Sequence, residues 1–380
     1  MKDGKLLSGD IRIASKKILD VNENLTSNRD DQVIRFDNHY LYRGLINAHD
    51  HLEMNLYPRM GTPPYNNYTE WARDVYKPQD SPVKEIESVP IRHRLVWGGI
   101  KNLISGVTTV VHHNPWYYSM DFNFPVRVLK KYQWAHSLAF EKNLKKKLRK
   151  ETPFIIHAAE GVDAFARNEI DQLDKLGLLN ANSVLVHGVA IGKNEIEKIS
   201  RANASLVWCP SSNLFMFRKT ADVPEIEKKI SVALGSDSTM TGCATFLDEM
   251  KAAHQSEMAT AGKIFEMASV IPERIFNLPS QQISPGFPAD LLIMPIKTQD
   301  YYDNLILQDS ADISAVIING KLQYADPIVA DGLNSKGFPH KVGNADKWFA
   351  YDIARLKEKI LSKGMPESLI QKNELWQLLN

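Results

Sequence analysis

Residues 153–188 read PFIIHAAEGVDAFARNEIDQLDKLGLLNANSVLVHG. Two short apolar runs, at 153–158 and 183–188, stand on either side of a stretch whose apolar residues recur at helical spacing. Runs that are apolar on both faces are typical of parallel strands covered by helices. The stretch therefore predicts a strand, a helix and a second parallel strand, with a histidine at the end of each strand.

The same alternation extends over the middle of the chain in both directions. The further apolar runs are LINAHDH (45–51), VTTVVHH (107–113), QWAHSL (133–138), SLVWCP (205–210) and SVALGSD (231–237). About seven such units, without a glycine-rich dinucleotide fingerprint, favour an α/β protein with a (β/α) barrel over a doubly wound sheet. The segment between residues 113 and 153 has room for only one or two strands, so the sequence does not establish the full eight.

Both ends of the chain are richer in short strand-like segments. They occur between residues 5 and 42 and again between 289 and 324, where Asn319-Gly320 is a strong hairpin signal. KWFAYDIARLKEKILSKG, near the C-terminal end, is amphipathic and predicts a helix. The expected units are a β domain from residues 1–42 and 283–335, a barrel at 43–282 and a helical tail at 336–380.

The composition is that of an ordinary globular protein. The 380 residues include 46 basic and 45 acidic residues, for a formal net charge of +1, and 43% are hydrophobic. Neither sign of charge dominates, and the basic run KNLKKKLRK (142–150) is interpreted as the solvated face of a surface helix rather than a nucleic-acid site. Two distant cysteines, Cys209 and Cys243, indicate no disulfide framework and no cysteine-based zinc site.

The sequence also carries an expectation about location and partners. Its first residues lack the apolar core of a signal peptide, and no apolar run approaches the ~18 residues of a membrane span. We therefore expect a cytoplasmic protein that acts on a small molecule, without nucleic-acid or membrane partners. A homo-oligomer is left open.

Most histidines in the middle of the chain lie at the carboxyl ends of the apolar runs. These are His49 and His51, His112 and His113, His157 and His187, and Asp237 ends the last run in the same way. In a parallel barrel the carboxyl ends of the strands meet at one mouth, where active sites are built. A histidine in that position loses hydration and needs a partner, which a shared metal ion would supply.

A single divalent metal ion fits four of these residues. His49 and His51 are two positions apart on a strand, so both side chains point to the same face. His157 supplies a third nitrogen and Asp237 a carboxylate oxygen, which leaves a position open for water. Such ligands suit zinc, our first expectation, with iron(II) and manganese as alternatives. The ion lowers the pKa of its water so that hydroxide exists near neutral pH.

Three residues are candidates for acid–base chemistry. Glu160 lies three residues after His157 and is the candidate for protonating the leaving group. Taken alone, an acidic residue in that position is also favourable at a helix N-terminus. His187 is a candidate for orienting the attacking water or polarising the substrate, and Asp237 for accepting the proton of that water.

Further residues around the expected mouth are candidates for substrate contact. The run HHNPWYY follows a predicted strand with a dense aromatic group, which either lines a pocket for a flat ring or packs a long loop. The serines and the asparagine of CPSSNLF also suit a turn that is ordered by side-chain-to-backbone bonds. The candidate substrate-binding residues are Glu53, His112, His113, Trp116 and Asn213.

These motifs, in this order, resemble the amidohydrolase superfamily, and most closely its cytosine deaminase and chlorohydrolase-like branch. The resemblance covers residues 8–325 and rests on GLINAHDHLEMN, GVTTVVHH, IIHAAEG, VLVHGV, VWCPSSNLF, VALGSDS, PGFPADLLIM and VIINGKLQYAD. It implies a distorted TIM barrel with a small β-sandwich made from both chain ends. The implied roles are His49, His51, His157 and Asp237 as ligands of one metal ion, and Glu160, His187 and Asp237 as acid–base groups.

The chain departs from the family pattern between His113 and His157, where it is shorter than most relatives. Members with two metal ions use a carboxylated lysine on the fourth strand, but neither Lys130 nor Lys131 ends a clear apolar run here. The His-x-x-Glu motif also belongs to the branch with one metal ion. We therefore expect one divalent ion per chain.

The expected reaction is metal-dependent hydrolysis of a carbon–nitrogen bond, as the deamination of a small heterocyclic amine. Hydrolysis of a cyclic amide, or loss of another leaving group such as chloride, uses the same activated water and stays an alternative. A catalytically inactive scaffold on the same fold is a second alternative. Loss of ligands would mark such a scaffold, whereas all four expected ligands are present in this sequence.

Overall fold

The structure is a computed structural model of the chain, and it describes residues 1–380 except 1–5, 7, 142–143 and 145–150. The basic run at 142–150, for which a surface helix is predicted, lies outside the described residues apart from Leu144. Among the described residues, no helix is both long enough and apolar enough to cross a membrane.

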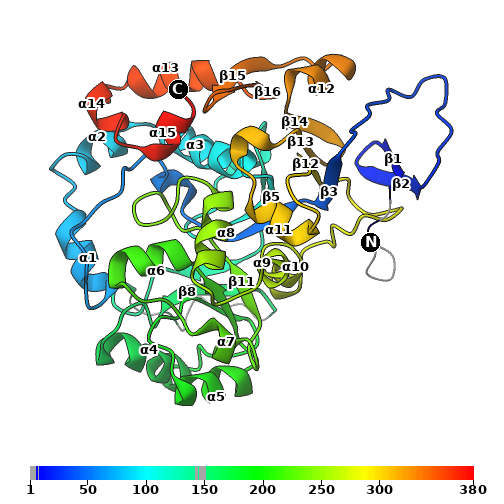
Figure 1. Cartoon of the computed structure of the whole chain (residues 1–380). Coiled ribbons are helices and arrows are strands. Elements are labelled where there is room, and N and C mark those ends of the chain that lie inside the picture. The colour runs from blue at the N-terminus through cyan, green and yellow to red at the C-terminus, as the bar shows by residue number, and fades with distance from the viewer. Residues whose placement is uncertain (1–5, 7, 142–143, 145–150) are drawn as a thin grey trace.

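In the part of the chain that the structure describes, eight parallel strands lie at the centre of the molecule, in two sheets (Figure 1). The three-stranded sheet consists of β4 (Leu45–Asp50), β5 (Val107–His112) and β6 (Arg127–Val128). The five-stranded sheet consists of β7 (Gln133–Ala135), β8 (Phe154–Ala158), β9 (Ser183–His187), β10 (Ser205–Trp208) and β11 (Val232–Leu234). The predicted parallel strands are thus confirmed, and the described part of the segment between residues 113 and 153 holds two very short ones.

The two parallel sheets are joined by hydrogen bonds near the carboxyl ends of their strands. The backbone N–H of Ser236, just after β11, donates to the carbonyl of His49 in β4 at 3.0 Å. The N–H of Asp237 donates to the same carbonyl at 3.1 Å. These bonds hold the carboxyl ends of strands from both sheets close together.

Helices connect the strands. They are α1 (Tyr68–Val75), α2 (Val83–Ser88), α3 (Ile91–Leu103), α4 (Ala164–Lys175), α5 (Lys193–Arg201), α6 (Pro210–Phe217), α7 (Val223–Ile226), α8 (Phe246–Gln255), α9 (Ala261–Met267) and α10 (Val270–Ile275), with 3₁₀ turns at Leu52–Met54 and Tyr118–Asp121. Helix α4 shows why they form where they do. Asp163 caps it by accepting from the N–H of Ala166, and Ala166, Ile170 and Leu173 form its buried stripe. The strand–helix–strand unit predicted at 153–188 is therefore β8, α4 and β9.

A second, antiparallel sheet brings the two ends of the chain together. Its strands, in order, are β15 (Phe338–Val342), β16 (Ala345–Phe349), β14 (Lys321–Ala325), β13 (Ala315–Ile318), β12 (Leu291–Pro295) and β3 (His39–Arg43). Helices α11 (Tyr301–Ile306) and α12 (Pro327–Gly332) and a 3₁₀ turn at Ser310–Asp312 lie between its strands. A separate hairpin, β1 (Asp10–Ala14) with β2 (Lys17–Asn22), stands beside it in Figure 1. The predicted contribution of both chain ends to one β unit is seen in the pairing of β3 with β12.

The predicted helical tail at 336–380 is wrong in its first part. Residues 338–349 form the hairpin β15–β16, which extends the antiparallel sheet through Tyr324 of β14. Helices α13 (Ile353–Leu361), α14 (Glu367–Ile370) and α15 (Glu374–Leu378) follow it, and Figure 1 shows them beside α2 and α3. Trp376 packs on Trp97 of α3 with ring centroids 5.0 Å apart. The C-terminal part is therefore packed onto the body of the protein.

Candidate active site

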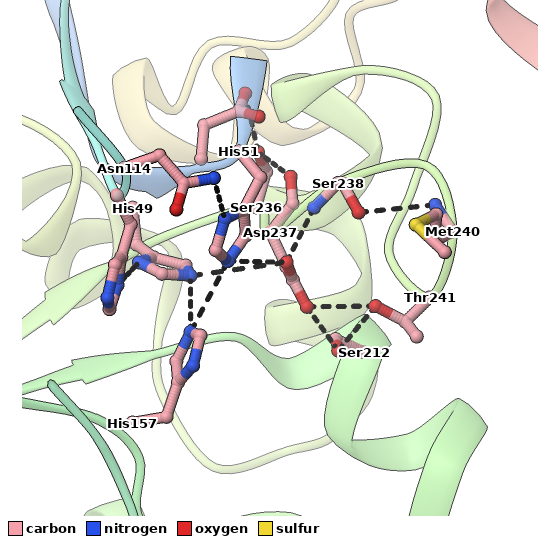
Figure 2. Close-up of polar contacts among 12 residues, drawn as sticks. His49, His51, Asn114, His157, Ser212, Ser236, Asp237, Ser238, Met240 and Thr241 are labelled. Carbon is pink, nitrogen blue, oxygen red and sulfur yellow. Dashed lines mark hydrogen bonds and ion pairs between the residues drawn. The ribbon is translucent and has the colours of Figure 1, made fainter. Parts of the chain in front are cut away.

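The imidazoles of His49, His51 and His157 converge beside the carboxylate of Asp237 (Figure 2). His49 belongs to β4, His51 follows that strand directly, and His157 belongs to β8. The Nε2 atom of His157 lies 3.3 Å from Nε2 of His49 and 3.4 Å from Nε2 of His51. Oδ1 of Asp237 lies 3.8 Å from Nε2 of His51 and 4.0 Å from Nε2 of His49. The structure thus brings together all four residues expected to be ligands.

The spacing of these nitrogens fits one metal ion. Two nitrogens bound at about 2.0–2.1 Å to a tetrahedral zinc ion lie roughly 3.3–3.4 Å apart. That is the separation of His157 from His49 and His51, at 3.3 and 3.4 Å. Nδ1 of His157 is buried and has no hydrogen-bond partner among the described residues. Imidazole and carboxylate donors suit zinc, iron(II) or manganese, so these side chains fit such an ion.

The buried imidazoles can offer lone pairs. Burial holds the pKa of His49 and that of His157 well below the usual value for histidine, and the neighbouring imidazoles lower both further. Both rings are therefore neutral at physiological pH, which is the form in which histidine binds metals.

Asp237 is held so that one of its oxygens faces the histidines. Its backbone is left-handed, with φ of +53°, just beyond the end of β11. Ser212 and Thr241 each donate a hydroxyl hydrogen bond to Oδ2 at 2.8 Å, as Figure 2 shows. Although burial acts to raise the pKa of Asp237, nearby His51 and these hydroxyl groups lower it below the usual value for aspartate. Oδ1, on the side of His49 and His51, is thus a carboxylate oxygen at neutral pH.

Glu160 and His187 form a second pair next to this group. Oε1 of Glu160 lies 3.6 Å from Nε2 of His187. Nδ1 of His187 is 2.9 Å from Oδ1 of Asn213, so it donates there and leaves Nε2 facing Glu160. Burial raises the pKa of Glu160 well above its usual value, and the nearby carboxylates of Asp237 and Glu169 raise it further. The raised pKa favours the protonated form of Glu160, the form that a general acid needs.

The residues expected to contact the substrate lie in different surroundings in the structure. Asn213 is fully buried and holds His187, also through its amide N–H to the carbonyl of that residue at 3.3 Å. Glu53 accepts a hydrogen bond from Asn114, and its Oε2 lies 3.8 Å from Nε2 of His112. Those two atoms are buried and lack hydrogen-bond partners within the described part of the chain. Trp116 is partly buried and carries the ammonium of Lys130 over its ring, 5.6 Å from the centroid.

His113 lies inside the histidine group instead of at a mouth. One nitrogen of each of His49, His51, His113 and His157 falls within 4.8 Å of the others, so the four form a group that could hold a metal ion. His113 is fully buried. The structure therefore offers His113 as a ligand or as a neighbour of the ligands, two roles that the sequence did not indicate.

Several other residues at the site were not identified from the sequence. Lys101 of α3 is fully buried, and its ammonium donates to the carbonyl of Asp237 at 2.7 Å. The amide of Asn114 lies 3.4 Å from Nδ1 of His51. Glu169 of α4 accepts from the N–H of Ala159 at 3.0 Å. The sequence did hold two signals for these residues. Asn114 comes just after the histidine pair, and Lys101 is a charged residue between apolar ones.

Comparison with known proteins identifies the family. The sequence profile of the amidohydrolase family matches residues 134–323, which is half of the chain. The chain belongs to the amidohydrolase family. The matched segment carries His157, Glu160, His187 and Asp237, and it continues into the antiparallel sheet as far as β14.

Related amidohydrolases include enzymes of nucleoside chemistry. A 5-methylthioadenosine/S-adenosylhomocysteine deaminase from Pyrococcus furiosus is 24% identical over 84% of this chain and 92% of its own length. A 5'-deoxyadenosine deaminase from Methanothrix thermoacetophila is 23% identical over 87% of this chain and 93% of its own. The chain is thus similar to these deaminases over nearly their whole length.

Two solved structures share the fold over almost the whole chain. A mutant of atrazine chlorohydrolase from Arthrobacter aurescens TC1, complexed with zinc and atraton, superposes with a TM-score of 0.72, 15% identity and coverage of 95% of this chain and 96% of its own. An adenosine deaminase from Xanthomonas campestris with bound zinc superposes with a TM-score of 0.66, 17% identity and coverage of 96% and 94%. At these identities the likeness is one of fold.

Proposed function

We propose that this amidohydrolase catalyses the hydrolytic deamination of a small heterocyclic amine. The observation that carries the proposal is the convergence of the Nε2 atoms of His49, His51 and His157 on Oδ1 of Asp237, next to the buried pair of Glu160 and His187. Relatives named as deaminases of adenosine derivatives support the choice of a heterocyclic amine.

The proposed cofactor is one divalent ion, with zinc first and iron(II) or manganese as alternatives. His49, His51, His157 and Asp237 would hold it, and it would lower the pKa of water so that hydroxide forms near neutral pH. Lys130 pairs with Asp121 and is exposed, so it is not placed to bridge two ions. We also propose that the eight parallel strands form the distorted barrel of this family, with residues 1–42 and 283–335 as its β domain.

The residues of the chain supply the proton transfers of deamination. The reaction adds water to the ring carbon that carries the amino group and releases ammonia, so one proton must reach the leaving nitrogen. Burial raises the pKa of Glu160 and so favours its protonated form, and Glu160 is the proposed donor. Oδ1 of Asp237, which faces His49 and His51, accepts the proton of the attacking water; both hydroxyl donors are on Oδ2, and the N–H of Ser238 donates to Oδ1 at 2.7 Å. His187, fixed by Asn213, orients the water or polarises the substrate.

The test is ammonia release from a panel of aminated purines, pyrimidines and triazines, with protein loaded with Zn²⁺, Fe²⁺ or Mn²⁺. We expect ammonia from at least one of them. Glu160→Gln should lower kcat by about 10²–10⁴-fold, since it removes a general acid, and Asp237→Ala should abolish turnover without unfolding the protein. Glu197→Gln, on the exposed side of α5, is the matched control.

Other outcomes separate the alternatives. Acid or halide release from cyclic amides or chlorinated rings, with no ammonia from any amine, would replace deamination by another hydrolysis on the same site. Wild-type turnover in Asp237→Ala would contradict the role of this carboxylate. A protein that takes up no metal would support the inactive scaffold.

A further inference from the structure

His113 touches all three imidazoles that we propose as ligands. Its ring stacks on that of His157, with centroids 4.3 Å apart and planes at 28°, and on that of His51, at 5.2 Å and 22°. It meets His49 edge-on, at 4.9 Å and 87°. Its backbone N–H donates to the carbonyl of Asp50 at 3.0 Å, and Asp50 lies between His49 and His51 in the chain. The residue is therefore fixed against both the strand and the rings of the site.

The hydrogen bonds of His113 determine which of its nitrogens carries the proton. Nε2 lies 2.9 Å from the carbonyl oxygen of Ala135. A carbonyl only accepts, so Nε2 is the protonated nitrogen. In a neutral imidazole the other nitrogen is then an acceptor. Nδ1 of His113 lies 3.3 Å from Nδ1 of His49, which must therefore donate.

The same chain of bonds determines the ligand atom of His49. With its proton on Nδ1, His49 has its lone pair on Nε2. That nitrogen is the one that faces Nε2 of His157 at 3.3 Å and Oδ1 of Asp237 at 4.0 Å. Metal-bound histidines usually donate their other N–H to an acceptor that fixes tautomer and ring orientation. Here the acceptor is a second imidazole.

We propose that His113 is a positioning residue that fixes the tautomer and orientation of His49, and that it is neither a metal ligand nor a substrate contact. Both of its nitrogens already have partners within the chain, Ala135 and His49. As a fourth ligand through Nδ1 it would leave the N–H of His49 without its acceptor. The inference rests on the proposed metal site.

Two substitutions separate the stacking of the His113 ring from its hydrogen bonding. His113→Phe keeps a ring for stacking and removes both hydrogen bonds. His113→Asn places an amide oxygen near the position of Nδ1 and so retains an acceptor for His49. His157→Asn is the benchmark for a lost ligand, and His254→Asn, near the C-terminal end of α8, is the control for the loss of a remote histidine.

The first measurement is Zn²⁺ affinity by competition with a chelator. We expect His113→Phe to bind Zn²⁺ about 10–100-fold more weakly than wild type, as for other residues that orient ligands. His113→Asn should recover most of that loss, and His157→Asn should bind more weakly than either. Equal Zn²⁺ affinity of His113→Phe and wild type would overturn the proposal.

The second measurement uses Co²⁺ in place of Zn²⁺. The absorption spectrum should report the same coordination in wild type, His113→Phe and His113→Asn. The solvent-exchangeable Nδ1 proton of His49 should be visible by paramagnetic NMR in wild type and lost to rapid exchange in His113→Phe. Changed coordination in His113→Asn, matching that of His157→Asn, would show a ligand and refute the positioning role.

The two failures can be told apart. Wild-type protein that binds neither Zn²⁺ nor Co²⁺ refutes the proposed metal site itself. Wild-type protein that binds both, together with His113 variants that behave as wild type, refutes only the role of His113. If His113→Phe does not fold, as thermal melting of the metal-free protein would reveal, the comparison of His113→Asn with His157→Asn decides the question.

Discussion

At the level of single residues, Glu169 is a buried carboxyl that stands directly behind the candidate acid. Its Oε1 accepts from the hydroxyl of Tyr68 at 2.7 Å, and its Oε2 accepts from the N–H of Ala159, next to Glu160, at 3.0 Å. Burial raises the pKa of Glu169 to about 7. The folded protein therefore binds this proton more tightly than the unfolded chain does.

This residue predicts how stability changes with pH. Between the usual glutamate pKa of 4.5 and the raised pKa of about 7, the folded state holds more protons than the unfolded state. The free energy of unfolding should then fall as pH rises through that window, by up to about 3 kcal/mol from this group. We expect Glu169→Gln to lose this part of the slope, measured by chemical denaturation at pH 5, 6, 7 and 8. Curves for the variant and wild type that run parallel would contradict it.

At the level of elements, a buried ion pair joins α3 to the ends of β4 and β11. The ammonium of Lys101 lies 3.4 Å from Oδ2 of Asp50 and 3.1 Å from Oγ of Ser236, and donates to the carbonyl of Asp237 at 2.7 Å. Amide groups of Asn55 and Asn102 donate to Asp50 at 2.8 Å each. One helix thus bonds to a side chain at the end of β4 and to the backbone just after β11, the two places that carry His49, His51 and Asp237.

Lys101→Met should uncouple these elements. It leaves the carboxylate of Asp50 buried without its cation, which typically costs about 3–5 kcal/mol of stability, and it frees the left-handed backbone at Asp237. The expected result is a lower melting temperature together with a lower kcat of the folded protein. Lys347→Met is the matched control, because that buried lysine pairs with Asp326 in the antiparallel sheet, away from the site. An unchanged kcat in folded Lys101→Met would contradict a role of Lys101 in positioning Asp237.

At the level of the whole molecule, the C-terminal helices support the loops at the site. Asn373, buried at the start of α15, donates to the carbonyls of Asn55 at 3.0 Å and Tyr57 at 2.7 Å, in the loop after β4. It also accepts from the N–H of Trp376 and so caps its helix. The last helix is therefore bonded to the segment that follows the His49–His51 strand.

Asn373→Ala should loosen this attachment. It removes the amide donor from the carbonyl of Asn55 and one of two donors from the carbonyl of Tyr57, which the hydroxyl of Thr239 still reaches at 2.7 Å. Together with the lost helix cap, the expected loss of stability is roughly 1–3 kcal/mol. We expect a lower melting temperature and faster proteolysis of the C-terminal helices. Gln377→Ala, exposed on the same helix, is the control and should behave as wild type. Equal proteolysis of both variants would mean that α15 is held by apolar packing alone.

The local sequence pattern was enough to predict the parallel strands and most residues of the proposed site. Apolar runs bounded by turn residues give parallel strands whatever their neighbours are, because a strand buried on both faces must be apolar throughout. His49, His51, His157, His187 and Asp237 stand out because polar residues at the ends of such runs need partners. The hairpin β15–β16 was missed because its strands are short and interrupted by charged residues, and pairing with the antiparallel sheet overrides their weak propensity.

By itself, the sequence determined the parallel strands, the family and the side chains that end those strands. Only the tertiary structure decided which groups surround them: the tautomer that His113 imposes on His49, the ammonium of Lys101 on Asp237 and the amide of Asn373 under the loop. The reason is physical. Strand formation depends on neighbours within a few residues, whereas each of these hydrogen bonds joins atoms far apart in the chain and exists only once separate elements have packed.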